Sequence, residues 1–438
     1  MSSPINTNPP TASIPEDMTG RPRRVVTGGI SLRKTFSALR HRNFRLFFYG
    51  QLISLIGTWM TTTAQGWLVY QLTGSKALLG VVAACASAPM LVFSTWGGWA
   101  ADRYSKRSVL VATQASSMIL SLAMAALVWS GHIQPWQIIV LAVLGGVTMA
   151  FDMPARQSFV IEMTSREDLM NAISLNSSVF NAARVIGPSI AGLLMAKVGI
   201  AMCFFIDGVS FIAVIAGLLM MQLPKRESAP SETGAIGQAL EGFRYVWNHP
   251  RPLTILALFA VVGIFGWSYS VLMPAFAHDV LHLGEQGYGM LMAASGVGAL
   301  LAALTVATAG HSFPSRPLAL GGVWIFSAGL ALFAFNRSLY VALVLLAISG
   351  FGIVLYFSTS NTVLQTIVPD EMRGRVMGIW TLVFGGMMPL GSLQAGLMAD
   401  FVGTPATIAI GALICALAAV VTLEVVRKRE ARRAAAIS

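Results

Sequence analysis

Residues 97–110 read GGWAADRYSKRSVL, and this short stretch concentrates one acidic and three basic side chains. The four are Asp102, Arg103, Lys106 and Arg107. The residues on both sides, 77–101 and 108–129, contain no charged side chain. Because a spanning helix needs about 20 mainly apolar residues, both flanks are long enough to cross a bilayer. The pattern predicts a short charged loop between two membrane-spanning helices.

The bulk composition supports a membrane protein. The chain has 438 residues, of which 55% are hydrophobic and 11% charged, and its mean hydropathy is +0.70. Since an average soluble domain carries about 25% charged residues, this chain lacks the polar side chains to cover a soluble surface. We therefore expect an integral membrane protein.

Twelve segments are long and apolar enough to span, and the longest internal gap divides them into six plus six. They centre on 44–70, 77–101, 107–129, 136–160, 169–195, 199–222, 252–276, 286–309, 316–335, 338–364, 374–399 and 404–426. The stretch GPSIAGLLMAKVG (187–199) aligns without gaps with GSLQAGLMADFVG (391–403). Both repeats run in the same sense through the membrane, an arrangement found in secondary transporters.

Basic residues predict the orientation. Eight lie before the first segment or at its start, twelve lie in the gaps after even-numbered segments or within a few residues of them, and five follow the last segment, whereas three occupy gaps after odd-numbered segments. The positive-inside rule therefore places both termini in the cytoplasm, and it explains the net charge of +11 without nucleic acid. The expected organisation is a cytoplasmic tail with an amphipathic surface helix (1–43), an N-terminal half (44–222), a cytoplasmic linker (223–251), a C-terminal half (252–426) and a basic cytoplasmic tail (427–438).

Three sets of residues resemble the major facilitator superfamily. The opening loop is similar to its signature Gly-x-x-x-Asp-Arg-x-Gly-Arg-Lys/Arg, with Ser105 in place of a glycine and Lys106 in place of an arginine. ARVIGPSIAG resembles the Gly-Pro antiporter motif through Gly187, Pro188 and Gly192, although alanines stand at two of its glycine positions. PARQSFVIEM, NAISLNSSVFNAARVIGP and VPDEMRGRVMG look like the enterobactin-exporter-like branch.

The resemblance covers residues 35–426 and implies a fold and a function. The fold is an all-α membrane protein of twelve transmembrane helices arranged as two parallel six-helix repeats. The function is secondary active transport in a bacterial inner membrane, as a proton-coupled exporter of siderophore-like or drug-like amphipathic molecules by alternating access. The alternatives are an uptake symporter or a facilitator on the same fold, and less favourably a membrane-embedded enzyme. The expected partners are the substrate, the proton gradient and the lipid bilayer, with no cofactor and a monomeric chain.

The resemblance also assigns the charged loop a role as a conformational latch. In the family, the loop aspartate lies against the start of span eleven, where the helix dipole favours a negative charge. Asp102 is thus expected near Gly374 and Arg375, and Lys106 is expected to pair with Glu162. These contacts form when the protein faces outward and break when it opens inward. The full set is Gly98, Asp102, Arg103, Lys106, Arg107, Glu162, Gly374 and Arg375. The alternative is an ordinary positive-inside loop.

Three charged residues stand out deep inside the predicted spans: Asp152, Arg184 and Asp207. A charge at mid-bilayer costs about 3 kcal/mol or more, so each needs a partner. Asp152 and Arg184 lie at similar depths in consecutive spans, differing by about 5 Å at 1.5 Å per residue, so we expect them to pair. Asp207 is the other possible partner of Arg184. Such a pair either fixes helix packing or includes the site that binds the transported proton.

Uncharged polar and aromatic residues are candidates to line a central cavity. They are Gln51, Trp59, Thr62, Gln65, Asn176, Asn181, Tyr269, Asn361 and Gln365. The alternative is that they form hydrogen bonds between helices. No metal site is expected, since HDVLH (278–282) has no third ligand cluster nearby. All six histidines lie in loops or at span ends, which argues against an enzyme.

Overall fold

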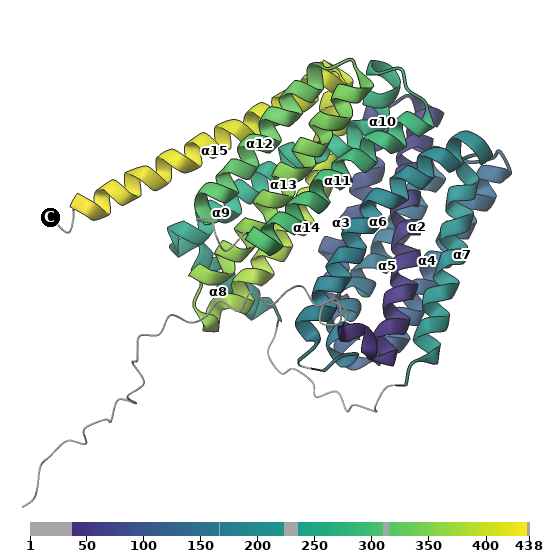
Figure 1. Cartoon of the computed structure of the whole chain (residues 1–438), viewed down its shortest axis with the longest axis horizontal. Helices are drawn as coiled ribbons and strands as arrows, with labels where there is room; N and C mark the ends of the chain where they lie inside the picture. Colours follow the sequence, from purple (N-terminus) through teal and green to yellow (C-terminus); the bar gives the residue numbers. More distant parts are fainter. Residues whose placement is uncertain (1–36, 166, 223–234, 310–314, 436–438) are drawn as a thin grey trace, which may run out of the picture.

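The computed structural model describes residues 37–165, 167–222, 235–309 and 315–435, and these ranges are helical apart from short connections (Figure 1). Eleven of the described helical segments are long and apolar enough to cross a membrane. The 32-residue helix α2 packs among them as the twelfth, against α6 and α7. The predicted all-α, twelve-helix membrane fold is therefore confirmed.

The first six membrane helices form a bundle that we call the N-terminal half. Serine caps begin two of them, because the Ser75 side chain accepts from the backbone N–H of Leu78 and Ser105 accepts from that of Ser108. The helices are α2 (Arg42–Thr73), α3 (Lys76–Arg103), α4 (Lys106–Trp129), α5 (Pro135–Glu162), α6 (Leu169–Val198) and α7 (Ile200–Met220).

The remaining membrane helices form the C-terminal half, preceded by helix α8 (Ala235–Asn248). The ion pair between Arg375 and Glu241, 2.7 Å apart, ties α8 to α14. The elements after α8 are α9 (Pro250–Val261), η2 (Val262–Gly266), η3 (Trp267–Leu272), α10 (Met273–Ala275), η4 (Phe276–Val280), α11 (Glu285–Ala309), α12 (Ser315–Phe335), α13 (Leu339–Ile367), α14 (Asp370–Val402) and α15 (Thr404–Ala435).

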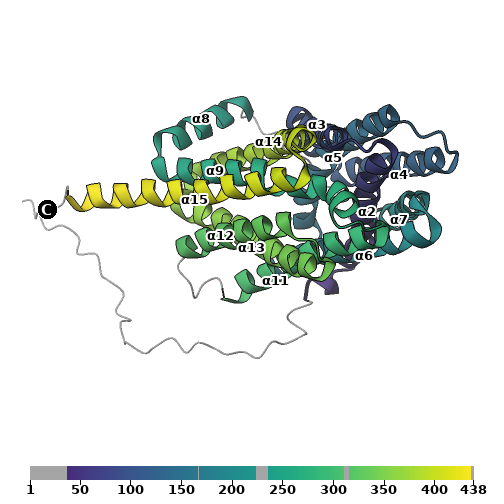
Figure 2. The same ribbon diagram turned by 90° about the horizontal axis from the view of Figure 1, so that it is seen from above.

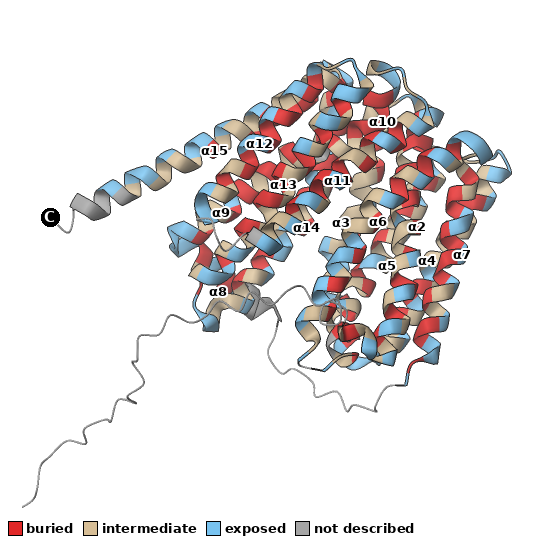
Figure 3. Ribbon diagram, in the orientation of Figure 1, coloured by how far each residue is buried: buried red, intermediate tan, exposed pale blue. Residues whose placement is uncertain are grey.

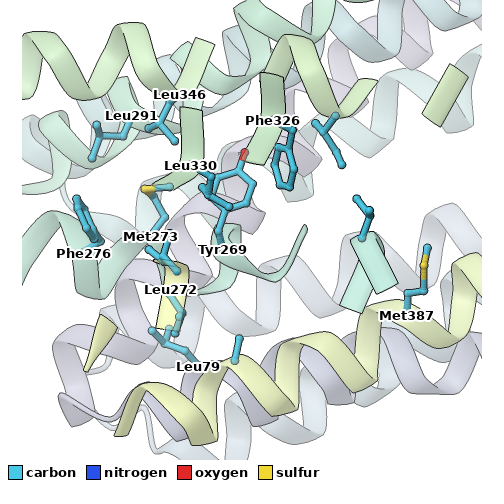
Figure 4. Packing of buried hydrophobic residues seen from close by; sticks show 14 of the residues in the cluster. Leu79, Tyr269, Leu272, Met273, Phe276, Leu291, Phe326, Leu330, Leu346 and Met387 are labelled. Carbon is cyan, nitrogen blue, oxygen red and sulfur yellow. The ribbon is translucent and has the colours of Figure 1, made fainter. Parts of the chain in front are cut away.

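Span seven is broken, where the sequence predicts one apolar helix over 252–276. Two π-helical turns, η2 and η4, flank a 3₁₀ segment, η3, and the short α10. The break is held by packing, because Tyr269, Leu272, Met273 and Phe276 insert into the core of the C-terminal half (Figure 4). Such π-turns occur frequently at functional sites, and irregular backbone is tolerated at membrane depth only inside protein or beside a cavity.

The two halves touch at one end and diverge at the other (Figure 1). We call the end with η1 (Ser37–Arg40) and α8 the terminal end, and the opposite end the far end. Toward the far end, α3 packs on α14 and α6 on α11. A Cβ added at Gly80 would lie 2.9 Å from the Cα of Gly396, so these helices approach backbone to backbone. Buried residues gather between the helices within each half (Figure 3).

Some predicted boundaries differ from the observed ones. Most of the expected surface helix falls outside the described residues, which begin with η1 and α2. Helix α15 continues to Ala435, beyond the predicted end of span twelve at residue 426. Arg156, which falls within the predicted segment 136–160, lies inside α5, one turn after Asp152. That placement changes the pairing of the buried charges.

Candidate functional site

Arg184 is held at the junction of the two halves by aromatic rings. Its Cζ lies 5.7 Å from the ring centroid of Trp59 on α2 and 4.9 Å from that of Trp267 on η3. Phe180, one turn before Arg184 on α6, packs edge-on against Trp59. Both rings lie within the ~6 Å at which a guanidinium is attracted by an aromatic face. Arg184 therefore contacts both halves at the level of the broken span.

The predicted pair between Asp152 and Arg184 is wrong. Asp152 Oδ2 lies 2.5 Å from Nη2 of Arg156, one turn along the same helix. Its Oδ1 accepts hydrogen bonds from Thr113 Oγ1 at 2.8 Å and Gln114 Nε2 at 2.7 Å. The Arg156 guanidinium also donates to Gln51 Oε1. Asp152 is thus neutralised within the N-terminal half.

The physical reason lies in rotation about the helix axis. Asp152 and Arg184 lie at similar depths along their helices. The Asp152 side chain on α5 points toward α4, however, whereas the Arg184 side chain on α6 points toward η3. Side chains four positions apart on a helix are neighbours on its surface, so Arg156 is the counter-ion of Asp152. Among the described residues, no carboxylate lies within ion-pair distance of Arg184.

Asp207 on α7 is buried and does not reach Arg184 either. Its Oδ2 accepts from Ser121 Oγ on α4 at 2.6 Å and from Thr61 Oγ1 on α2 at 3.4 Å. Its Oδ1 has no hydrogen-bond partner among the described residues. Gly57 makes room for this carboxylate, because a Cβ there would lie 2.4 Å from Oδ1. Asp207 is a buried carboxyl held by hydroxyl groups rather than by a cation.

The candidate cavity residues do not form one set. Trp59 contacts Arg184, whereas Gln51 is buried in the network of Asp152 and Arg156. Tyr269 is buried within the C-terminal half, its hydroxyl 2.7 Å from Ser295 Oγ. The others lie elsewhere on the helices: exposed Thr62 and partly buried Gln65 on α2, partly buried Asn176 and Asn181 on α6, and the hydrogen-bonded pair Asn361 and Gln365 on α13.

The Gly-Pro motif on α6 is a site of close helix packing. A Cβ at Gly187 would lie 2.6 Å from the Cβ of Trp59, within the N-terminal half. A Cβ at Gly192 would lie 3.1 Å from the Cα of Gly289 on α11, in the other half. Pro188 is buried between them. The motif thus brings α6 against α2 and α11 in the turns that follow Arg184.

The charged loop at the terminal end is anchored within the N-terminal half. Lys106 Nζ lies 2.5 Å from Glu162 Oε1, which is the pair expected from the sequence. Arg107 donates to the backbone carbonyls of Leu219 and Met221 at the end of α7, at 2.5 and 3.2 Å. These contacts tie α4 to α5 and α7.

The expected contact of Asp102 with the start of α14 is absent in this conformation. Asp102 and Arg103 are exposed, and Arg103 lies 5.7 Å from the ring centroid of Trp99. Arg375 pairs with Glu241 instead. Between residues that the structure describes, no hydrogen bond or ion pair joins the halves at the terminal end. A Cβ at Gly98 or Gly374 would meet nothing within 4 Å, so neither glycine has a steric role while the halves are apart.

A second polar cluster joins the halves at the far end, and sequence reasoning missed it. Asp279 on η4 accepts a hydrogen bond of 2.5 Å from Tyr70 on α2 and lies 3.7 Å from Lys76 Nζ on α3. Asp400 on α14 accepts from the backbone N–H groups of Lys76 and Ala77, at 3.2 and 3.3 Å. We call Tyr70, Lys76, Asp279 and Asp400 the far-end cluster. The feature of the sequence that could have indicated this cluster is a pair of aspartates at span ends, Asp279 and Asp400, together with a loop that contains the single lysine Lys76.

Comparisons with known proteins agree with this architecture. Residues 33–437 match the family model described as "Transmembrane secretion effector". The multidrug efflux pump Tap of Mycolicibacterium fortuitum is 31% identical over 396 residues, which cover 88% of this chain and 96% of that protein. The staphyloferrin A transporter of Staphylococcus aureus is 25% identical, covering 84% and 92%. The enterobactin exporter EntS of Shigella boydii is 27% identical, covering 80% and 83%.

Solved structures share the fold. A bacterial homologue of the human lysosomal transporter Spinster, in an inward-facing and occupied conformation, superposes with a TM-score of 0.72 at 13% identity, over 88% of this chain and 96% of that one. A point mutant of the nucleoside transporter NupG gives a TM-score of 0.71 at 14% identity, over 88% and 99%.

Proposed function

The chain belongs to the major facilitator superfamily, in the family described as transmembrane secretion effectors, and from this membership we propose that it exports siderophore-like or drug-like amphipathic molecules by proton antiport. The relatives named above include a multidrug efflux pump, a staphyloferrin A transporter and an enterobactin exporter, which supports both the direction and the substrate class. The transporter acts in the membrane on a small molecule, and we take the working unit to be a monomer in the bacterial inner membrane.

The observation that carries this proposal is the position of Arg184. It is a cation without a carboxylate partner among the described residues, and it contacts rings from both halves. The surroundings of a side chain that contacts both halves change when the halves move relative to each other. Because an uncompensated charge inside the membrane is costly, a substrate with a negative or oxygen-rich group and an apolar body gains from binding beside it. Oxygen-rich iron chelators and amphipathic drugs both have such groups.

The polar contacts at the two ends support alternating access. The far-end cluster is formed here, while the described residues of the charged loop at the terminal end make no polar contact across the halves. We take the terminal end as cytoplasmic, which makes this the inward-open state. In the outward-open state, Asp102 would cap α14 near Gly374, and the far-end cluster would break. The moving bodies would be the predicted halves, residues 44–222 and 252–426.

Asp207 is the proton carrier in this proposal. Asp152 already has Arg156 as its counter-ion, whereas Asp207 has hydroxyl partners and an Oδ1 that no described residue bonds. A buried carboxyl without a cation exchanges its proton when water reaches it, and opening of the halves would provide that access. The charge of Asp207 would then differ between the two states of the transport cycle.

Transport into everted membrane vesicles tests the proposal. We expect iron-free siderophores or amphipathic drugs to accumulate when a pH gradient is imposed, and accumulation to collapse when the gradient is dissipated. Arg184→Gln should raise the substrate concentration needed for half-maximal uptake, while Arg184→Lys keeps part of the effect. Asp207→Asn should abolish gradient-driven accumulation but keep exchange of labelled for unlabelled substrate. Accumulation independent of the gradient in the wild type would contradict antiport, and efflux from the vesicles would indicate an uptake protein.

A further inference from the structure

A cavity at the terminal end lies within the C-terminal half and is separate from the Arg184 site. Its volume is about 480 Å³, and its walls come from α9, α12, α13 and α15. Helix α15 extends away from the N-terminal half, and its C-terminal part projects beyond the other helices (Figures 1 and 2). Among the described residues, none from α2–α7 contributes to these walls, so a molecule bound here does not lie between the moving halves.

The cavity is apolar inside and basic at its mouth. The inner wall consists mainly of aliphatic side chains such as Ile255, Leu258, Leu320 and Val363. Three arginines stand where the helices begin or end: Arg251 in the first turn of α9, Arg316 in the first turn of α12, and Arg429 near the end of the apolar part of α15. No carboxylate occurs among the described residues that line the cavity.

One of the arginines is already oriented by the protein. Arg429 donates from Nη1 to the backbone carbonyl of Pro250 at 2.7 Å and to Thr254 Oγ1 at 3.1 Å. These bonds use acceptors without charge, so they hold the side chain at the mouth without cancelling its positive charge. From Arg251 to Leu258 the wall extends about 10 Å along α9, at 1.5 Å per residue.

We propose that this cavity binds an anionic phospholipid of the leaflet at the terminal end, with its phosphate among Arg251, Arg316 and Arg429 and an acyl chain along the aliphatic wall. Charge complementarity selects the headgroup, because arginine binds phosphate oxygens in a planar, multidentate geometry. The apolar wall selects a lipid over a soluble phosphate, which would leave that wall in contact with water. Basic pockets between membrane helices are a general means of holding anionic lipids.

The test uses the full-length protein purified in detergent. Retention of added phosphatidylglycerol and phosphatidylcholine is measured by native mass spectrometry, for the wild type and the double variant Arg251→Gln with Arg316→Gln. We expect the wild type to retain phosphatidylglycerol in preference to phosphatidylcholine. Each arginine removed should weaken retention about fivefold, the factor that corresponds to about 1 kcal/mol per basic residue near a membrane surface.

Three controls make the result decisive. Arg427→Gln removes an arginine of α15 that does not line the cavity, and it should retain the lipid as the wild type does. Val363→Trp fills the apolar wall with all three arginines in place, and it should lose the lipid. Glycerol 3-phosphate, which has the headgroup chemistry without acyl chains, should not compete. Equal binding of both lipids, equal losses in Arg427→Gln and the double variant, or full competition by glycerol 3-phosphate would each overturn the proposal.

Discussion

The carboxylate of Asp400 accepts a hydrogen bond from the backbone N–H of Lys76, 3.2 Å away, although 324 residues separate them in the chain. One half thereby caps the first turn of a helix in the other half. The expected contact at the opposite end has the same chemistry, with Asp102 at the end of α3 capping the first turn of α14. In this proposal, a carboxylate cap joins α3 and α14 at each end of the molecule: Asp400 at the far end and Asp102 at the terminal end. Of these two caps, only the one at the far end is formed in this structure.

Removing the cap at the far end should favour opening at that end. Loss of an N-cap side chain costs about 1 kcal/mol, so Asp400→Ala should shift the balance of conformations about fivefold toward far-end opening. The measurement is the distance between spin labels at the far ends of α3 and α14. Glu424→Ala, which removes an acid on α15 outside the cluster, is the control. An unchanged distance distribution in Asp400→Ala would show that the cap does not hold this state.

Neutralising the loop aspartate should act in the opposite direction. Asp102→Asn should leave expression normal and cut transport severely, because the outward-open state loses its contact with the α14 dipole. The same spin labels should report a larger share of the state seen here. Lys106→Gln should have a weaker effect, since it removes one ion pair that is partly exposed. Wild-type transport by Asp102→Asn would reject the latch.

The buried pair of the N-terminal half should behave as a unit. Asp152→Ala leaves Arg156 without its counter-ion, and breaking such a pair typically costs 3–5 kcal/mol when it is fully buried, so the yield of folded protein should fall. Adding Arg156→Ala should restore much of that yield, because both charges are then gone. Adding Arg184→Ala instead should not. Thermal unfolding in detergent measures all four proteins, and rescue by Arg184→Ala would contradict the observed pairing.

The orientation follows from labelling of single cysteines in intact cells. With Cys85, Cys203 and Cys415 replaced by alanine, cysteines at Ser105 and Gly374 should resist an impermeant maleimide. Cysteines at Gly131, Gly284 and Asn336, in loops of the far end, should react. Permeabilised cells provide the positive control, because every introduced cysteine should react there. A reversed pattern would place the terminal end outside.

Sequence alone was enough for the features that depend on local chemistry. A run of apolar residues identifies a span because every buried peptide group must bond within its own helix, and the charged loop identifies a span boundary because charge stays in water. The pair of Lys106 and Glu162, which the family resemblance implied, is present in the structure. The family resemblance rests on residues of these same loops and span ends.

Tertiary structure decided the partners of the buried charges and the break in span seven. Hydropathy reports position along a helix axis but not rotation about it, so it matched the depths of Asp152 and Arg184 without showing that they face different neighbours. The π-turns around Trp267 depend on packing against α11, α12 and α14, whose residues are distant in the chain. The far-end cluster forms for the same reason: Tyr70 and Asp279, 209 residues apart in the chain, meet where the two halves touch at that end.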